Sequence, residues 1–215
     1  MWRVTYGYRL IREDIRNLEN IQQIDKNQDL YDQLPNLVGS PLSINSLRED
    51  LSLNFKTVSR WIDIFDKNYA SFRIAPFGPP KLRAVKKERK LYLWDWARIE
   101  KPSFRLENLV ALHLLRLCHW FLDLKGIEYE LRFFRDTDRR EVDFILMHKK
   151  KALMAVEVKE SEQSLDPSLK YLLERVKIPY AFQVHLNGST YKRLDDINGA
   201  KVFLIPASRF LLNLP

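Results

Sequence analysis

Cysteine and glycine are both scarce in this chain of 215 residues. A single cysteine, Cys118, excludes an intramolecular disulfide and a zinc site built on several thiolates, and it is compatible with a reducing compartment. The six glycines frame neither a G-x-x-x-x-G-K-S/T loop nor a G-x-G-x-x-G turn, the two glycine-rich loops that bind nucleotide phosphates. We therefore expect no ATP site in this chain.

Long apolar runs are also missing. The best stretch, LVALHLLRLCHWFLDL, is interrupted by His113, Arg116 and His119, so it does not resemble a membrane span. The N-terminus lacks the apolar core of a signal peptide. The sequence thus predicts a cytoplasmic protein with no membrane partner.

The composition that is present is globular and basic. Hydrophobic residues make up 46% and charged residues 30%, enough to fill one large domain or two small ones. The formal net charge is +8 and the pI is about 9.5. Such a surface attracts polyanions, so DNA is the first partner that we expect.

The sequence before residue 103 predicts helices first and then two strands. Residues 1–34 carry apolar side chains at steps of three and four, which predicts a helical linker segment. Residues 35–102 then give a helix in SPLSINSLREDL with Ser43 as N-cap, and a second helix in NFKTVSRWIDIFDKN. Two strands follow, YASFRIAPF and LYLWDW, separated by the basic run KLRAVKKERK.

Helix, turn, helix and a strand pair with a basic tip is the order of a winged helix. In that arrangement the exposed face of the second helix is suited to a major groove and the basic tip to phosphates. The alternative is a packing module whose charges are only solvated. The residues that we expect to contact DNA are Asn54, Lys56, Thr57, Arg60, Lys86, Lys87 and Arg89.

Residues 103–215 are typical of an α/β domain. A helix from about Phe104 to Leu124 is expected, with Ser103 as N-cap and Gly126 at its end. The strands EYELRFF, VDFILMH, ALMAVEVK, YAFQVHL and KVFLIPA surround a helix in PSLKYLLERV, and most of them are nearly all apolar. The fold class that follows is α/β (mixed α+β), with a domain boundary at Pro102 and Ser103.

Two carboxylates interrupt the apolar strands of EVDFILMHKKKALMAVEVKE. If the two strands form a hairpin centred on Lys150, Asp143 faces Glu157, and Lys159 lies on the same face as Glu157. Buried like charges repel and are costly to desolvate, so a divalent cation would offset them. The alternative is a buried salt-bridge cluster in which Lys159 bridges the two acids. A register slip of one residue would separate Asp143 from Glu157.

A fourth acid, Glu107, shares a stripe of the long helix with Val110, Ala111 and Leu114. It lies close to the N-terminus of that helix. It could therefore interact with the helix dipole, face solvent, or reach the metal.

A carboxylate followed by E-x-K on the paired strand resembles the PD-(D/E)XK nuclease superfamily. The segments FRLENLVALHLL, ELRFFRDTDRREVDFIL, AVEVKES and VFLIPASRFLL are similar to the C-terminal domain of unknown function of many prokaryotic AAA-type ATPases. The earlier segments YRLIREDIRNLENI and VGSPLSINSLREDLSLNFKTVSRWIDIFDKNY are similar to its helical linker and winged helix. The resemblance extends from about residue 6 to residue 212. The P-loop module upstream in that family is absent, which suggests a fragment or a truncated member.

This resemblance implies roles for individual residues. Asp143, Glu157 and Glu107 would bind Mg²⁺ or Mn²⁺, and Lys159 would be the catalytic lysine, with Glu107 as an auxiliary acid. The proline that precedes the aspartate in the superfamily motif is Val142 here. A fold of this kind does not establish its activity.

Two functions follow from the resemblance. The first is metal-dependent hydrolysis of a DNA phosphodiester, in which the metal activates water and Lys159 stabilises the developing charge. The second is a non-catalytic DNA- or protein-binding output module with an inactive nuclease fold. In both cases the expected partners are DNA and an ATPase module, and either function is compatible with an oligomer.

Overall fold

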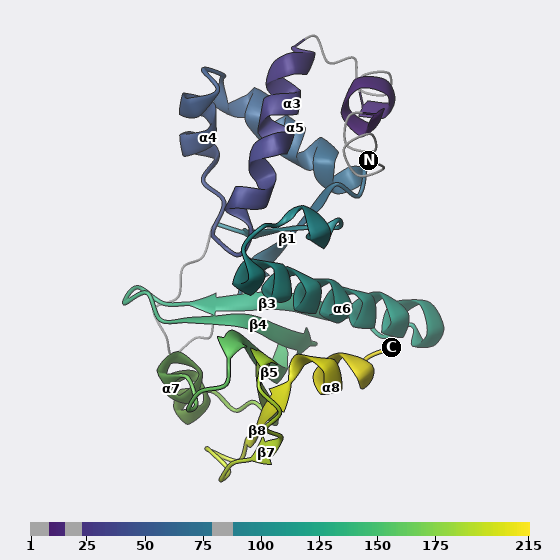
Figure 1. The fold of residues 1–215 in the computed structure, drawn as a ribbon. Helices are drawn as coiled ribbons and strands as arrows, with labels where there is room; N and C mark the ends of the chain where they lie inside the picture. The colour runs from purple at the N-terminus through teal and green to yellow at the C-terminus, as the bar shows by residue number, and fades with distance from the viewer. Residues whose placement is uncertain (1–8, 16–22, 79–87) are drawn as a thin grey trace.

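The computed structural model describes residues 9–15, 23–78 and 88–215. In this part of the chain, helices surround one mixed sheet of eight strands (Figure 1). The predicted class, α/β (mixed α+β), is confirmed. No helix among the described residues has both the length and the apolar character that crossing a bilayer requires.

The N-terminal segment is helical wherever it is described. A π-helical turn, η1 (Leu10–Ile15), and helix α3 (Ile24–Gln33) pack on each other, and a 3-10 turn, η2 (Leu34–Leu37), follows. Leu10, Ile11 and Leu30 are buried in the main core, as their helical spacing predicts. The middle of the expected helix, residues 16–22, lies outside the described residues.

Helices α4 (Ile44–Asp50) and α5 (Phe55–Lys67) confirm the two predicted helices. Ser43 caps α4 as expected, and its hydroxyl accepts a hydrogen bond from the Ser46 amide at 3.2 Å. The apolar stripe of α5 is buried because its members recur every three or four residues. These residues are Val58, Trp61, Ile62, Ile64 and Phe65.

Strands β1 (Ser71–Pro76) and β2 (Lys90–Leu93) form the predicted antiparallel pair. The pair is part of the main sheet, because β1 also runs parallel to β3 and places Ala75 beside Arg132. One hydrophobic core extends from α5 to the long helix of the C-terminal half. Sheet and core are therefore continuous across Pro102 and Ser103, and the domain boundary there stays a prediction.

The long helix, α6 (Pro102–Lys125), begins earlier than expected. The prediction of Ser103 as N-cap is wrong, since Lys101 occupies the cap position and Pro102 is the first helical residue. Proline suits this position because its φ angle is already helical and its missing amide hydrogen has no partner there. Gly126 ends the helix as expected, with a left-handed φ of 62°.

The sheet has the order β2-β1-β3-β4-β5-β6-β8-β7. Its central strands carry apolar residues on both faces, because α6 and α8 (Ala207–Leu212) cover one face and α7 (Pro167–Arg175) covers the other (Figure 1). Sequence reasoning missed the short strand β7 and helix α8. The remaining strands are β3 (Tyr129–Arg135), β4 (Glu141–His148), β5 (Lys151–Ser161), β6 (Tyr180–Asn187), β7 (Lys192–Arg193) and β8 (Lys201–Pro206). A 3-10 turn, η3 (Trp96–Arg98), precedes α6.

The β4–β5 hairpin has the expected register but a different turn. His148 pairs with Lys151, so the turn is the two residues Lys149 and Lys150, both with positive φ, and the predicted turn centred on Lys150 is wrong. A β-bulge then leaves Leu153 as an extra residue on β5. The bulge restores the predicted register, in which Phe144 pairs with Val156.

Candidate functional site

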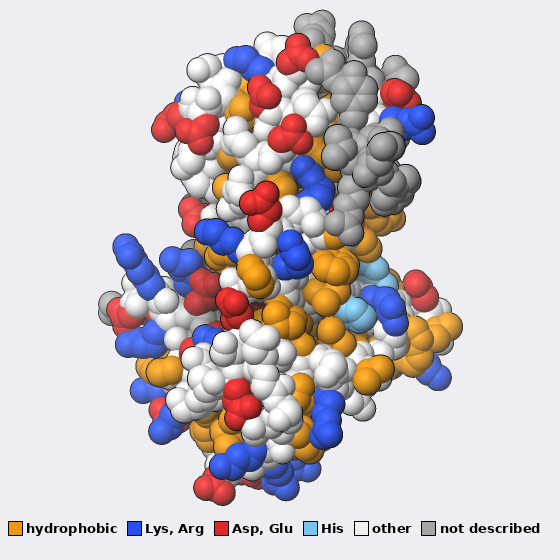
Figure 2. All heavy atoms as spheres, viewed as in Figure 1, with side chains coloured by type: hydrophobic (Ala, Val, Ile, Leu, Met, Phe, Trp, Pro, Cys, Tyr) orange, Lys and Arg blue, Asp and Glu red, His pale blue; other side chains and the backbone are white. Residues whose placement is uncertain are grey.

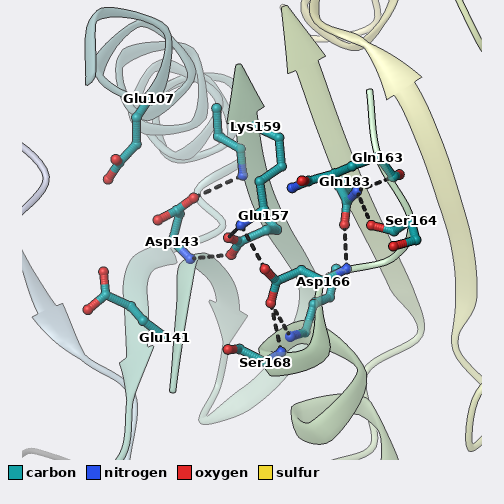
Figure 3. A network of polar contacts seen from close by, with 12 residues as sticks. Glu107, Glu141, Asp143, Glu157, Lys159, Gln163, Ser164, Asp166, Ser168 and Gln183 are labelled. Carbon is teal, nitrogen blue, oxygen red and sulfur yellow. Dashed lines mark hydrogen bonds and ion pairs between the residues drawn. The ribbon is translucent and has the colours of Figure 1, made fainter. Parts of the chain in front are cut away.

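Four acids from three elements converge at one end of β4 and β5 (Figure 3). Glu107 comes from the start of α6, Glu141 and Asp143 from β4, and Glu157 from β5. Glu107, Asp143 and Glu157 are only 8%, 9% and 6% exposed. The structure thus brings together the three acids that the sequence singled out, and it adds Glu141.

Asp143 and Glu157 are held together by the hairpin itself. The backbone N–H of Asp143 donates to Glu157 Oε2 at 3.3 Å, and the N–H of Val158 donates to Asp143 Oδ2 at 2.9 Å. Each carboxylate therefore accepts a hydrogen bond from the strand of the other. Burial, and the nearby charge of Asp143, raise the pKa of Glu157 well above its usual value.

Lys159 lies beside Glu157, as the period of two along a strand predicts. Its ammonium contacts Glu157 Oε1 and Asp166 Oδ2, each at 2.7 Å. Burial alone would lower the pKa of Lys159, but these two carboxylates outweigh it and raise that pKa. Lys159 therefore remains charged and bridges the site to helix α7.

Sequence reasoning missed Asp166, which sits just before α7. Its side chain caps the helix by accepting from the Ser168 amide at 2.7 Å, and its own amide donates to Gln183 Oε1 at 2.7 Å. Burial opposes its ionisation, but Lys159 and the amides at the helix start outweigh burial and lower the pKa of Asp166. The signal that could have found it is an aspartate immediately before Pro167, because proline often opens a helix after such a cap.

The most consequential omission is Lys90. Its side chain is fully buried, and its ammonium lies 2.6 Å from Glu141 Oε1 and 3.3 Å from both Glu107 Oε1 and Asp143 Oδ1. Burial would lower its pKa, but Tyr92 and the three acids hold the pKa of Lys90 well above its usual value. A single ammonium therefore sits among three carboxylates.

Lys90 was hidden by its neighbours in the sequence. It ends the basic run KLRAVKKERK, which the sequence pattern predicts to be the exposed tip of a wing. In the structure it is the first residue of β2 and lies on the same side of that strand as Tyr92, whose hydroxyl donates to Glu107 Oε1 at 2.8 Å. The signal that could have found it is this spacing of two from a tyrosine inside a buried strand.

Glu107 faces the cluster rather than solvent or the helix dipole alone. Burial and the charge of Asp143 raise the pKa of Glu107 to about 7, against the opposing effects of Lys90 and Tyr92. Gly39 covers its carboxylate, since a Cβ at that position would lie 2.8 Å from Glu107 Oε2. The N-terminal half therefore supplies Gly39, Lys90 and Tyr92 to a site whose acids belong to the C-terminal half.

These acids, as they are arranged, do not fit a divalent cation. Mg²⁺ requires oxygen ligands at about 2.0–2.1 Å, and here the space between Glu107, Glu141 and Asp143 holds the Lys90 ammonium. In the described part of the chain, no group of three or more His, Cys, Asp or Glu side chains could hold a metal ion. The expected Mg²⁺ or Mn²⁺ site stays a prediction.

Of the residues expected to contact DNA, those on α5 are not part of this cluster, whereas Arg89 directly precedes Lys90. Lys56 and Arg60 are exposed on α5 and border a shallow pocket of about 310 Å³, and Thr57 is half-buried on the same helix. The side chain of Asn54 caps α5 by accepting from the Thr57 amide at 2.8 Å. Arg89 is exposed before β2, whereas Lys86 and Lys87 lie outside the described residues.

On the face shown in Figure 2, Lys and Arg side chains are spread over both halves and alternate with Asp and Glu. The net positive charge is thus not gathered into one continuous patch on this face.

Two family models match the chain. Residues 1–98 match a domain of unknown function (DUF8612), and residues 104–210 match a domain of unknown function (DUF4143), which is associated with AAA-type ATPases. No curated protein and no solved structure matches.

Proposed function

We propose that this chain is a non-catalytic DNA-binding output module that works with an AAA-type ATPase, and that its nuclease-like acids serve as a scaffold. The observation that carries the proposal is the Lys90 ammonium among Glu107, Glu141 and Asp143. It supplies positive charge where a catalytic metal would be needed. The association of DUF4143 with AAA-type ATPases supports the choice of partner.

The balance of charges supports a structural role for the cluster. A buried carboxylate without a counter-charge is expensive, and removing one partner of a buried ion pair typically costs about 3–5 kcal/mol. Lys90 and Lys159 between them contact all four acids and also Asp166. Arg135 also pairs with Glu141 at 3.0 Å. These cations, together with the protons that the raised pKa values of Glu107 and Glu157 favour, offset the buried negative charge.

DNA binding is supported by the basic character of the chain and by the order of its first elements. Helix α5 exposes Lys56 and Arg60, and the following strands β1 and β2 flank a segment rich in lysine. Backbone phosphates would be neutralised by these cations, which makes the affinity depend on salt.

Hydrolysis of DNA is the second candidate function. The observation that favours it is the closeness of Asp143, Glu157 and Lys159, the residues to which the resemblance assigns metal binding and catalysis. It would require that Lys90 leave its position among the acids.

One assay separates the two functions. Purified wild type is incubated with linear and four-way DNA in Mg²⁺ or Mn²⁺, alongside Glu157→Gln, while fluorescence anisotropy reports binding of the same DNA. We expect binding without cleavage, in both proteins. Metal-dependent cleavage by the wild type that disappears in Glu157→Gln would instead establish the hydrolase.

The DNA role has its own control. Lys56→Ala with Arg60→Ala should weaken DNA binding and reduce its salt dependence. Lys125→Ala with Lys170→Ala removes the same charge from exposed positions on α6 and α7, away from α5. Equal effects of the two double variants, or no binding by the wild type, would refute the assignment of α5 as the DNA surface.

A further inference from the structure

A broad groove lies where strands β5, β6 and β8 begin. It has a volume of about 1080 Å³, slightly above the roughly 300–1,000 Å³ of ordinary ligand pockets. Its lining includes residues 150–153 at the start of β5 and residues 176–179 between α7 and β6. The carboxylate cluster, which consists of Glu107, Glu141, Asp143 and Glu157, contributes none of its lining residues, so the groove is a separate feature.

The floor of the groove is mostly aliphatic and includes one aromatic ring, that of Phe77. Met147 and Ala152 are buried there, and Leu153, the extra residue of the β-bulge, is half-buried beside them. Ile178 and Pro179 also line the groove. Contact between this surface and aliphatic side chains of a ligand would remove apolar area from water, which favours binding.

The rim of the groove is positively charged. Lys150, Lys151 and Lys177 are exposed, and none of the three forms an ion pair with another residue in the described ranges. The acid that lines the groove, Glu130, is paired with Arg132. The rim therefore attracts negative groups placed above an aliphatic floor.

Among the described residues, the start of β5 also has an unpaired edge. Lys151 and Ala152 pair with β4 on one side, but the pairing of β5 with β6 begins only where Met154 meets Tyr180. An extended peptide can add to such an edge through backbone hydrogen bonds. The groove thus combines a strand edge, an aliphatic floor and a basic rim.

We propose that this groove binds an extended, acidic segment of a partner protein, added as a short strand beside the start of β5. Aliphatic side chains of the segment would cover Leu153 and Pro179, which are half-buried and exposed, and its Asp or Glu residues would face the three lysines. A nucleic acid fits less well, because single-stranded sites rely on several stacked aromatic rings, whereas Phe77 is the one aromatic residue among the described lining residues. The neighbouring segment 79–87 carries four basic residues and no acid, so its charge does not complement the rim.

This proposal uses no residue assigned to DNA binding or to the carboxylate cluster. It therefore stands or falls independently of the proposed function.

Selection from a library of random twelve-residue peptides displayed on phage tests the proposal on the full chain. The library is first depleted on the variant Lys150→Glu/Lys151→Glu/Lys177→Glu and then selected on the wild type. We expect sequences in which Asp or Glu alternates with Ile, Leu or Val. A fluorescein-labelled peptide of the selected sequence should bind the depletion variant at least tenfold more weakly than the wild type.

Three controls decide the interpretation. Lys125→Glu/Lys170→Glu/Lys192→Glu makes the same charge change at exposed positions outside the groove, and it should bind the peptide like the wild type. Methylation of alternate backbone nitrogens of the peptide should abolish binding, because it removes the hydrogen bonds to the strand edge. Circular dichroism verifies that each variant is folded.

The proposal is overturned if selection yields no peptide or a basic one, or if both triple variants bind the selected peptide equally. It is also overturned if a single-stranded DNA of twenty nucleotides displaces the peptide and its binding is lost in the groove variant. In that case the groove is a phosphate-binding surface.

Discussion

At the scale of single residues, the site depends on which cation compensates which acid. Asp143, Glu157 and Lys159 could be placed from sequence because alternate residues of a strand share a face. Lys90 could not, since its contacts with Glu107 and Asp143 join residues 17 and 53 positions apart. A basic run in the sequence carries no information about which of its members is buried.

Substitution of Lys90 tests its role as the compensating cation. Lys90→Met keeps a similar length but leaves Glu107, Glu141 and Asp143 without their shared counter-charge. We expect the free energy of unfolding, measured in urea, to fall by about 3–5 kcal/mol. Adding Glu107→Gln to Lys90→Met should recover part of this loss. A fall of less than about 1 kcal/mol would show that the ammonium is dispensable.

The raised pKa of Glu107 predicts how stability depends on pH. A carboxyl whose pKa is about 7 when folded and near 4.5 when unfolded binds its proton more tightly in the folded state. Its contribution to stability is therefore complete below pH 4.5 and is lost as the pH rises through 7. The loss is on the order of 3 kcal/mol.

The measurement compares wild type with Glu107→Gln in urea at several pH values. The decline between pH 4.5 and 7 should be smaller in the variant, because the glutamine does not titrate. Some decline should remain, because Glu157, whose pKa is also raised, still contributes. Parallel curves for the two proteins would show that Glu107 titrates normally.

At the scale of elements, local patterns predicted most helices and strands but not their connections. The apolar stripe of α5 and the alternation in β4 and β5 were sufficient to place those elements. The β4–β5 turn was not predictable, because a two-residue turn with a bulge and a three-residue turn give the same register further along. Helix α6 began early for a similar local reason, the preference of Pro102 for the first helical position.

Gly39 provides a prediction at this scale. Its φ is +73°, and an added Cβ would also lie 2.8 Å from Glu107 Oε2. Gly199 has a φ of +83° with nothing within 4 Å, so it is a matched control for backbone strain alone. We expect Gly39→Ala to reduce the free energy of unfolding by about 1–3 kcal/mol more than Gly199→Ala. Equal losses would mean that the loop carrying Gly39 does not press on Glu107.

At the scale of the whole molecule, the two halves share one sheet, one core and one charge cluster. Composition and the resemblance suggested a division at Pro102 and Ser103, and the two family matches end and begin close to it. The sequence could not reveal that β1 pairs with β3 or that Lys90 reaches Asp143, because such pairings depend on how distant segments pack.

This continuity predicts that the chain unfolds as a single unit. Amide hydrogens of α5 in the N-terminal half and of β6 in the C-terminal half should exchange with the same free energy of opening at their slowest sites. Lys90→Met should lower both values together. Two distinct values, of which Lys90→Met changes only one, would show that the halves unfold separately.

The central claim is that Lys90 occupies the place that a catalytic metal would need. The most direct test is isothermal titration calorimetry with Mn²⁺ at pH 7.5, performed on the wild type and on Glu157→Gln. The account predicts no saturable binding to either protein. A saturable site in the wild type that is lost in Glu157→Gln would contradict it, because the acids would then hold a metal despite the ammonium.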